Sequence, residues 1–204
     1  NEITWIKKFK TICTGDAPNY QWFKEGKVNV SENCLDRHLD INKDAIIHIS
    51  EDNQKRVLSY EDLYQAVNNF SYSLKSIGQK KGSRVIIYMP TIPESIIAML
   101  ACARLGLIHS VVFAGFSAES LKDRINDCEA ELVITVDSFK RDGKKIKAKD
   151  TVDSAIRSGC PSIKKVIVFK NSKETVSFNP NIDLWWTEIL PKSDQIVSPE
   201  VMSA

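Results

Sequence analysis

The sequence of 204 residues lacks long apolar runs and any large excess of charge. Its most apolar stretch, residues 96–103, ends at Arg104, far short of the roughly 20 residues that span a bilayer. With 28 basic and 26 acidic side chains, the formal net charge is +2, too balanced to attract nucleic acid or a membrane surface through bulk charge. We therefore expect neither partner, and any binding of anions must be local.

Paired cysteine motifs and a leader are also missing. The sequence has no C-x-x-C pair, and its odd number of cysteines argues against a disulfide framework. Residues 1–9 lack the charged start, apolar stretch and small-residue cleavage site of a secretory leader. These absences predict reduced thiols and a cytoplasmic location. The five scattered cysteines are Cys13, Cys34, Cys102, Cys128 and Cys160.

The common catalytic signatures do not occur. There is no G-x-G-x-x-G or G-x-x-x-x-G-K-[ST] phosphate loop, no G-x-S-x-G elbow and no H-E-x-x-H zinc motif. The three histidines, His38, His48 and His109, are far apart. His48 and His109 fall in apolar strands, where a hydrogen-bonded core role is more common than catalysis. The sequence thus predicts no catalytic residue and no metal site within these residues.

What the sequence does contain is the pattern of a folded α/β protein. Apolar residues make up 43% and charged residues 26%, as in ordinary globular domains. After Ser59 the apolar residues recur in steps of four and three, which predicts an amphipathic helix. Ser59 and Asp62 can form its capping box, and Gly78 can end it. The recurring residues are Leu63, Val67, Phe70, Leu74 and Ile77.

The remaining segments alternate between strand and helix. Apolar strands interspersed with helices predict a doubly wound, mainly parallel sheet with flanking helices that cover both faces. We expect strands at residues 45–49, 56–58, 84–89, 108–113, 132–136 and 165–169, the first two as a hairpin. We expect helices from Pro93 to Gly106, from Ser117 through Cys128 and over residues 151–157, with a last helical turn at Trp185 and Trp186.

Three parts follow from this pattern. Residues 1–44 carry aromatic and polar residues without sustained periodicity, so we expect an arm that packs on a larger body. Residues 45–190 form the α/β portion. Residues 191–204 form a polar connector that leads to no further strand, as at an exposed loop.

A basic segment at residues 140–149 is the clearest local signal for an anion. Gly143 lets its backbone turn tightly, and such a cluster suits a phosphate monoester. The alternative is a solvated charged face, which the residues alone favour. The cluster consists of Lys140, Arg141, Lys144, Lys145, Lys147 and Lys149 around one acid, Asp142.

A second candidate is the strand-turn-helix Val-Val-Phe-Ala-Gly-Phe-Ser at residues 111–117. Gly115, after Ala114, allows close approach of the backbone, and the helix that starts at Ser117 points its amide-rich end at the turn. Ligands in open parallel sheets collect at such strand ends. The alternative is an ordinary loop with a helix cap, and the residues alone favour it.

Four segments resemble one family, the AMP-forming acetyl-CoA synthetases of the adenylate-forming enzymes. They are W-F-K-E-G-K-V-N-V-S-E-N-C-L-D-R-H at residues 22–38, Y-M-P-T-I-P-E at 88–94, A-R-L-G-L-I-H-S-V-V-F-A-G-F-S at 103–117 and L-V-I-T at 132–135. The resemblance implies a reaction in which acetate and ATP, with magnesium, give acetyl-adenylate and pyrophosphate. Coenzyme A then displaces AMP.

The resemblance also implies a site. Arg141, Asp142, Gly143 and Lys144 look like the family segment that contacts the 3′-phosphate of coenzyme A. Residues 114–115 match a turn beside its pantetheine or adenine portion. The family often has arginine where Lys144 stands and glycine at position 114. With the resemblance, phosphate binding becomes the favoured interpretation of the basic segment.

In this family the chain continues into a Thr/Ser/Gly-rich phosphate loop, the ATP, adenylate and acetate pockets, and a domain with a catalytic lysine. The resemblance therefore implies an incomplete amino-terminal part of the enzyme domain, inactive alone, whose partners are acetate, ATP, CoA and the remainder of the polypeptide. Two alternatives stay open. One is a propionyl-CoA synthetase, because the acyl pocket lies downstream; the other is a non-catalytic nucleotide-sensing or interaction module.

Overall fold

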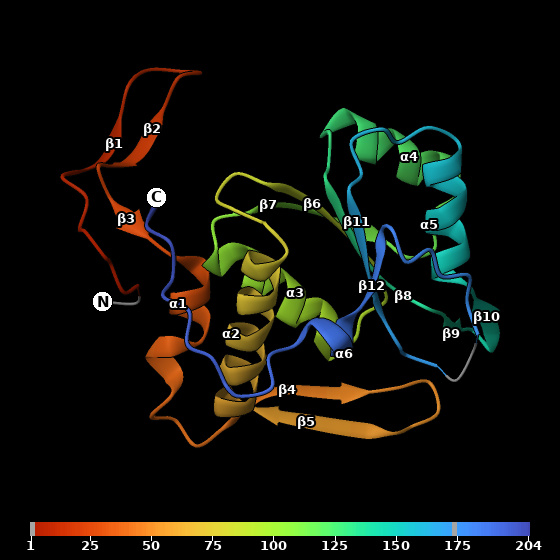
Figure 1. Cartoon of the computed structure of the whole chain (residues 1–204). Helices are drawn as coiled ribbons and strands as arrows, with labels where there is room; N and C mark the ends of the chain where they lie inside the picture. The colour runs from red at the N-terminus through yellow and green to blue at the C-terminus, as the bar shows by residue number, and fades with distance from the viewer. Residues whose placement is uncertain (1–2, 173–174) are drawn as a thin grey trace.

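The computed structural model describes residues 3–172 and 175–204 (Figure 1), so the first two residues of the predicted arm lie outside the described part. A five-stranded parallel sheet forms its centre, as the alternation predicted. The strand order is β12-β11-β8-β6-β7, with β6 at Arg84–Met89, β7 at Ile108–Phe113, β8 at Leu132–Val136, β11 at Lys165–Phe169 and β12 at Asp183–Trp185. Every residue of the central strand β8 is buried, which explains its unbroken apolar sequence.

Helices lie on both sides of this sheet. Figure 1 shows the pair α2 and α3 on one side and the pair α4 and α5 on the other. Their bounds are Tyr60–Ser76, Pro93–Arg104, Ala118–Asp127 and Ala148–Arg157, and a short α6 spans Trp186–Ile189. Helix α5 begins earlier than the sequence predicted, and Trp185 belongs to β12, a strand that the sequence did not predict. None of the helices in the described ranges has the length and apolarity to traverse a bilayer.

The helix predicted after Ser59 is confirmed in detail. Ser59 accepts a hydrogen bond from the backbone of Asp62, and the Asp62 side chain accepts one from the backbone of Ser59. Gly78 follows the helix with φ +91, a conformation that favours glycine. Four of the five predicted apolar residues are buried, and Ile77 packs at the edge of the core. Helix α2 therefore forms from signals that its own sequence carries.

The prediction that the sheet is covered on both faces is wrong at β7. Ile108 and Val111 are 60% and 53% exposed, and Phe113 is half-exposed. Strand β7 is the last strand in the sheet and pairs with β6 alone among the described residues. The sequence predicted a buried strand because composition does not distinguish a central strand from an edge strand.

The amino-terminal arm holds more structure than its sequence predicted. It contains β1 (Thr11–Thr14), β2 (Gln21–Lys24), β3 (Lys27–Val28), α1 (Val30–Cys34) and a 3-10 turn, η1 (Asp36–His38). Its aromatic residues pack on one another, with the Trp5 and Phe9 ring centroids 4.9 Å apart and Phe9 and Phe23 5.1 Å apart. The arm thus builds a small cluster of its own beside the main body (Figure 1).

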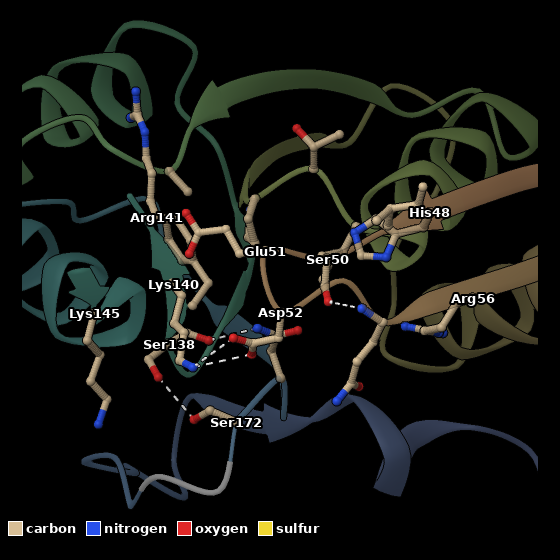
Figure 2. Close-up of a pocket in the computed structure, with 18 of the residues that line it drawn as sticks. His48, Ser50, Glu51, Asp52, Arg56, Ser138, Lys140, Arg141, Lys145 and Ser172 are labelled. Carbon is tan, nitrogen blue, oxygen red and sulfur yellow. Dashed lines mark hydrogen bonds and ion pairs between the residues drawn. The ribbon is translucent and has the colours of Figure 1, made fainter. Parts of the chain in front are cut away.

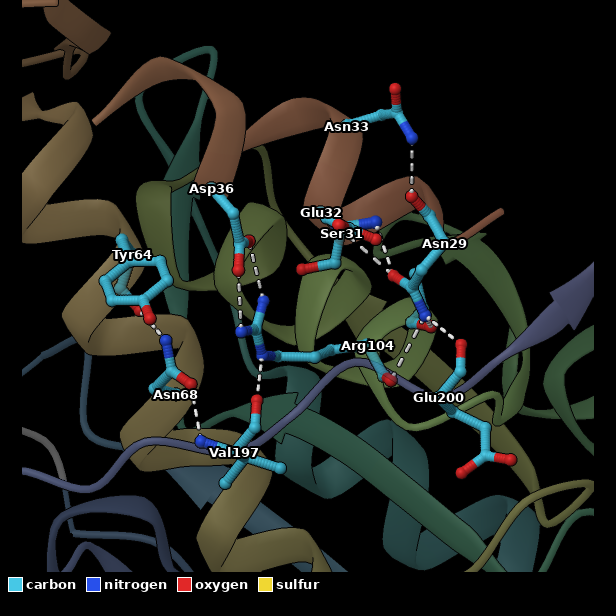
Figure 3. A network of polar contacts seen from close by, with 11 residues as sticks. Asn29, Ser31, Glu32, Asn33, Asp36, Tyr64, Asn68, Arg104, Val197 and Glu200 are labelled. Carbon is cyan, nitrogen blue, oxygen red and sulfur yellow. Dashed lines mark hydrogen bonds and ion pairs between the residues drawn. The ribbon is translucent and has the colours of Figure 1, made fainter. Parts of the chain in front are cut away.

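The carboxy-terminal connector is not a free loop. Its strand β13 (Met202–Ser203) pairs antiparallel with β3, which corrects the prediction of no further strand. Arg104 on α3, 1% exposed, donates to both carboxylate oxygens of Asp36 at 2.8 and 2.9 Å and to the Val197 carbonyl at 2.5 Å. Asn29 donates to the Glu200 carbonyl at 2.8 Å (Figure 3). These contacts join the arm, α3 and the connector.

Candidate functional site

A cavity of about 960 Å³ lies at the carboxyl ends of the strands, within the size range of ligand pockets. Its floor comes from residues that follow three strands: Pro90 after β6, Ala114 after β7 and Ser138 after β8. Two hairpins form its walls. One is β4 (Asp44–Ile49) with β5 (Lys55–Ser59), as predicted, and the other is β9 (Phe139–Arg141) with β10 (Lys144–Ile146). The cavity thus lies at the strand ends, where the sequence predicted that a ligand would bind.

The basic segment is a hairpin and not an irregular loop. Arg141 and Lys144 are opposite each other in its register, and Asp142 and Gly143 form the tight turn with φ +51 and +70. The positive φ explains the glycine at this turn. Arg141 and Gly143 line the cavity, together with Lys140 and Lys145.

Lys149 does not belong to this cluster. It lies in α5, 1% exposed, with its ammonium 2.6 Å from Asp153 and 2.8 Å from Asp183. A buried lysine needs such partners because desolvation of an unpaired charge is costly. Lys147 forms an ion pair with Asp150, with its Nζ 3.5 Å from a carboxylate oxygen. The predicted cluster therefore shrinks to the four cations of the β9–β10 hairpin.

The two predicted site segments meet. The Arg141 guanidinium carbon lies 4.6 Å from the centre of the Phe113 ring, a cation–π distance. A Cβ atom added at Gly115 would lie 2.9 Å from Arg141 Nη1, so any side chain there would displace the guanidinium. Tyr88 holds this turn by donating its hydroxyl proton to the Phe116 carbonyl at 2.8 Å. The structure thus brings residues 113–115 and 141–144 into one cluster, with Ala114 buried in the floor.

Phe113 was missed as a site residue by sequence reasoning. It is the last residue of an apolar strand, so its sequence indicates core packing, yet its ring is half-exposed beside the cavity. The position immediately before the Ala-Gly turn was the available signal. A flat ring covered on one side by a guanidinium is a surface on which a planar heterocycle can stack.

Acidic residues from the facing hairpin also reach the basic hairpin, and no sequence signal predicted them. Lys140 Nζ lies 3.2 Å from both carboxylate oxygens of Asp52. The Glu51 carboxylate accepts a hydrogen bond from the backbone N–H of Asp142. Figure 2 shows the contact between Lys140 and Asp52. Because Lys140 and Asp52 are both mostly exposed, this ion pair is weak and open to competition.

A stronger ion pair lies on the cavity wall that the β4–β5 hairpin forms. Arg56 on β5 contacts both carboxylate oxygens of Glu94 at 2.8 and 3.2 Å, and Glu94 is 8% exposed in its side chain. Glu94 lies in the first turn of α3, where the helix dipole also favours a carboxylate. This pair attaches the β4–β5 hairpin to the body.

The predictions for the histidines have mixed outcomes. His48, opposite Arg56, lines the cavity, and its Nδ1 is buried without a hydrogen-bond partner in the described residues. The predicted hydrogen-bonded core role is therefore wrong for His48, because its strand belongs to a projecting hairpin. His109, on β7, is partly buried; burial lowers its pKa, and a hydrogen bond to the backbone of Leu107 partly offsets this.

Within the described ranges, no three histidine, cysteine, aspartate or glutamate side chains are grouped so as to hold a metal ion. All five cysteines lie in those ranges and are free thiols. Burial raises the pKa of Cys102 to about 12, which keeps that thiol protonated and unreactive. The cations of the β9–β10 hairpin beside the exposed Phe113 ring suit an anion attached to a planar group.

Comparisons with known proteins agree with this picture. Residues 35–200 match the family model described as AMP-binding enzyme, and residues 1–34 match the one described as acetyl-coenzyme A synthetase N-terminus. The chain is 47% identical to an acetyl-coenzyme A synthetase of Pasteurella multocida over 99% of its own length, and 47% identical to one of Wolinella succinogenes over 100%. It spans only 31% and 32% of the lengths of those relatives.

The fold also matches a solved structure. The acetoacetyl-CoA synthetase from Streptomyces lividans superimposes with a TM-score of 0.88 over 98% of this chain and 31% of that protein, at 24% identity. At that identity the match establishes the shared fold alone.

Proposed function

The chain belongs to the AMP-binding enzyme family, and on this premise we propose that it forms the amino-terminal part of an acetate–CoA ligase. The complete ligase would convert acetate, ATP and CoA to acetyl-CoA, AMP and pyrophosphate through acetyl-adenylate. Support comes from the acetyl-coenzyme A synthetases that match the chain along its whole length. In this proposal residues 1–44 are the arm, residues 45–190 the α/β portion of the large domain, and residues 191–204 the segment leading to the ATP-binding part.

The contribution of this chain is part of the CoA site. Arg141 and Lys144 would bind the 3′-phosphate, with Asp142 and Gly143 forming the turn between them, while Ala114 and Gly115 would leave room for the adenine or pantetheine portion. The observation that carries the proposal is the contact of Arg141 with Phe113 at the cavity, directly beside Gly115. Arginine suits a phosphate because its donors match two oxygens at once.

The same proposal leaves the chemical steps to the remainder of the polypeptide. Magnesium would accompany ATP and neutralise its phosphates, and no residue group described in this chain fits it. These residues would bind and orient CoA so that its thiol reaches the adenylate. Alone, the chain would be inactive. The free cysteines support a reducing, cytoplasmic setting for the ligase.

Two other functions are distinguishable from this one. A propionyl-CoA synthetase would share the CoA site and differ in the acyl pocket; the amino-terminal match to acetyl-coenzyme A synthetases favours acetate. A nucleotide-sensing module would bind CoA or a nucleotide stoichiometrically without any ligase activity. Rates with acetate and propionate, measured on the complete protein, separate the three.

The proposal predicts a selective defect for Arg141→Ala in the full-length ligase. Losing one charge-assisted phosphate contact costs about 1.5 to 3 kcal/mol, so the KM for CoA should rise roughly ten- to a hundredfold. Acetate-dependent exchange of pyrophosphate into ATP, which reports adenylate formation without CoA, should stay near the wild-type rate. Equal loss of both activities would contradict the assigned role.

Arg124→Ala is a matched control. Arg124 lies 5.3 Å from the centre of the Phe116 ring, so it has the same kind of arginine–aromatic contact beside the same turn. It comes from α4 and is not among the residues that line the cavity. Its loss should leave the KM for CoA within about twofold of wild type, because weak exposed contacts contribute little.

A further inference from the structure

A buried carboxylate lies at the base of the basic hairpin. Asp137 follows β8 directly and is fully buried. Its Oδ1 accepts hydrogen bonds from the backbone N–H of Ser138 at 2.6 Å and of Asn171 at 2.9 Å. Its Oδ2 accepts from the Ser172 backbone at 3.0 Å and from the Ser172 hydroxyl at 2.8 Å. The Ser172 backbone N–H also lies 3.2 Å from Oδ1, so each oxygen accepts from at least two donors, which come from the ends of two neighbouring strands.

The backbone of Asp137 joins the same parts. Its N–H donates to the Phe169 carbonyl of β11 at 3.0 Å, and its carbonyl accepts from Lys149, where the chain leaves the hairpin, at 3.2 Å. The Asn171 side chain donates to the Ser138 carbonyl at 3.0 Å, and the hydroxyls of Ser138 and Ser172 lie 3.0 Å apart (Figure 2). One residue therefore fixes the entry and the exit of the hairpin against the sheet.

The hairpin has little else that sets its direction. Each of its strands has only three residues, and an isolated two-stranded hairpin is marginal at best. At its tip the Lys140–Asp52 ion pair and the hydrogen bond from the backbone N–H of Asp142 to Glu51 are both exposed, so solvent weakens both. Phe139 and Ile146 pack at its base against the core, but apolar contacts are not directional. The angle of the hairpin thus depends on the hydrogen bonds of Asp137.

Orientation matters because Arg141 is some distance from this base. Arg141 is four positions after Asp137 in the chain, which is about 13 Å at full extension, so a small rotation at Asp137 becomes a large displacement of the guanidinium. The contacts that define the site are short-range: the Phe113 ring at 4.6 Å and the bare Gly115 backbone. Displacement would break both together.

We propose that Asp137 is a positioning residue for CoA recognition, acting by holding the β9–β10 hairpin so that Arg141 lies over Phe113 beside Gly115. This rests on the proposed function of the site. A carboxylate is required because it accepts at both oxygens; an asparagine would present an NH₂ donor to two existing donors. Sequence reasoning passed over Asp137, although an acidic residue at the carboxyl end of a buried strand was the available signal.

The test uses Asp137→Asn and Ser172→Ala in the full-length ligase. Asp137→Asn should raise the KM for CoA by about tenfold or more, because the new amide NH₂ group would face N–H or O–H donors in place of one carboxylate oxygen. Ser172→Ala removes the hydroxyl that donates to Asp137 and should raise the KM for CoA by roughly two- to threefold. For both variants, acetate-dependent pyrophosphate exchange should stay within about twofold of wild type, since the proposed function assigns adenylate formation to the remainder of the polypeptide.

Asp36→Asn is the control for general destabilisation. Asp36 is the carboxylate partner of the buried Arg104 and follows α1 in the arm, and α1 lies on the opposite side of the molecule from β9 and β10 (Figure 1). Its loss should lower the melting temperature at least as much as Asp137→Asn and leave the KM for CoA unchanged. A double variant, Asp137→Asn with Arg141→Ala, adds the decisive readout: if Asp137 acts through Arg141, its effect on CoA should largely vanish in the Arg141→Ala background.

The possible outcomes distinguish a failure of the positioning role of Asp137 from a failure of the proposed CoA site. If Arg141→Ala raises the KM for CoA and Asp137→Asn does not, the positioning role is overturned and the CoA site stands. If Asp137→Asn impairs both half-reactions equally, or its effect adds fully to that of Arg141→Ala, the residue is merely structural and the inference is also overturned. If Arg141→Ala itself has no effect on CoA, the proposed function fails. Should Asp137→Asn not yield folded protein, Ser172→Ala alone and combined with Arg141→Ala decides between these results.

Discussion

Two arginines, Arg104 and Arg141, show how differently this fold uses the same side chain. Arg104 is buried, and its guanidinium is fully engaged by Asp36 and the Val197 carbonyl (Figure 3). Arg141 is half-exposed at the cavity (Figure 2), with its guanidinium over the Phe113 ring and its Nε 3.7 Å from a carboxylate oxygen of Asp142. The first has its donors satisfied within the chain and holds segments together; the second keeps donors available for a ligand. The two arginines thus differ in burial and in how many of their donors are occupied, and we propose a binding role only for Arg141.

The largest effect on stability is expected where the donors are saturated. Arg104→Ala should lower the free energy of unfolding by about 3 to 5 kcal/mol, because it leaves Asp36 without its partner in a mostly buried pair. It should also release the connector at Val197. Urea unfolding of the 204-residue chain measures the loss, and Arg141→Ala provides the contrast, with a change below about 1 kcal/mol for an exposed contact. Similar losses of unfolding free energy for Arg104→Ala and Arg141→Ala would contradict the different roles assigned to the two arginines.

A smaller effect is expected at the facing tip of the β4–β5 hairpin. Because Glu51 and Asp52 occupy donors of the basic hairpin, the double variant Glu51→Gln, Asp52→Asn should lower the KM for CoA by roughly threefold at low salt, while unfolding changes by less than about 1 kcal/mol. The difference from wild type should fade at high ionic strength. A rise in the KM for CoA would mean that these acids support the site and do not compete with its ligand.

The smallest effect concerns pH. Burial lowers the pKa of His109 below its ordinary 6.5, so the unfolded chain binds a proton more readily than the folded one. The stability due to neutral His109 is therefore complete above pH 6.5 and is lost as pH falls through the lowered folded pKa. His109→Gln should flatten the dependence of unfolding free energy on pH in that window. An unchanged slope would assign the dependence to other groups.

The sequence predicted the elements whose signals are local. Helix α2 follows from its periodicity and its capping box at Ser59, and β8 from its unbroken apolar run. The resemblance also selected residues 114–115 and 141–144 separately, before the structure placed these two segments together. Local pattern and family likeness were enough for these parts because neither depends on distant contacts.

What could not be predicted depends on partners far away in the chain. Lys149 looked like part of a basic cluster because its partner Asp183 lies in a strand that the sequence did not reveal. One signal was present: Lys149 lies three residues before Val152 on the buried side of α5. The exposed edge at β7 and the pairing of β13 with β3 depend on strand order, which apolar patterns do not encode.

The most direct test of the central claim compares CoA with 3′-dephospho-CoA in the full-length ligase. If Arg141 binds the 3′-phosphate, the wild-type enzyme should have a much lower KM for CoA than for the dephosphorylated form, and Arg141→Ala should lose most of that preference by weakening CoA alone. If Arg141→Ala preserves the wild-type preference, the arginine does not read the phosphate and the account of this site is wrong.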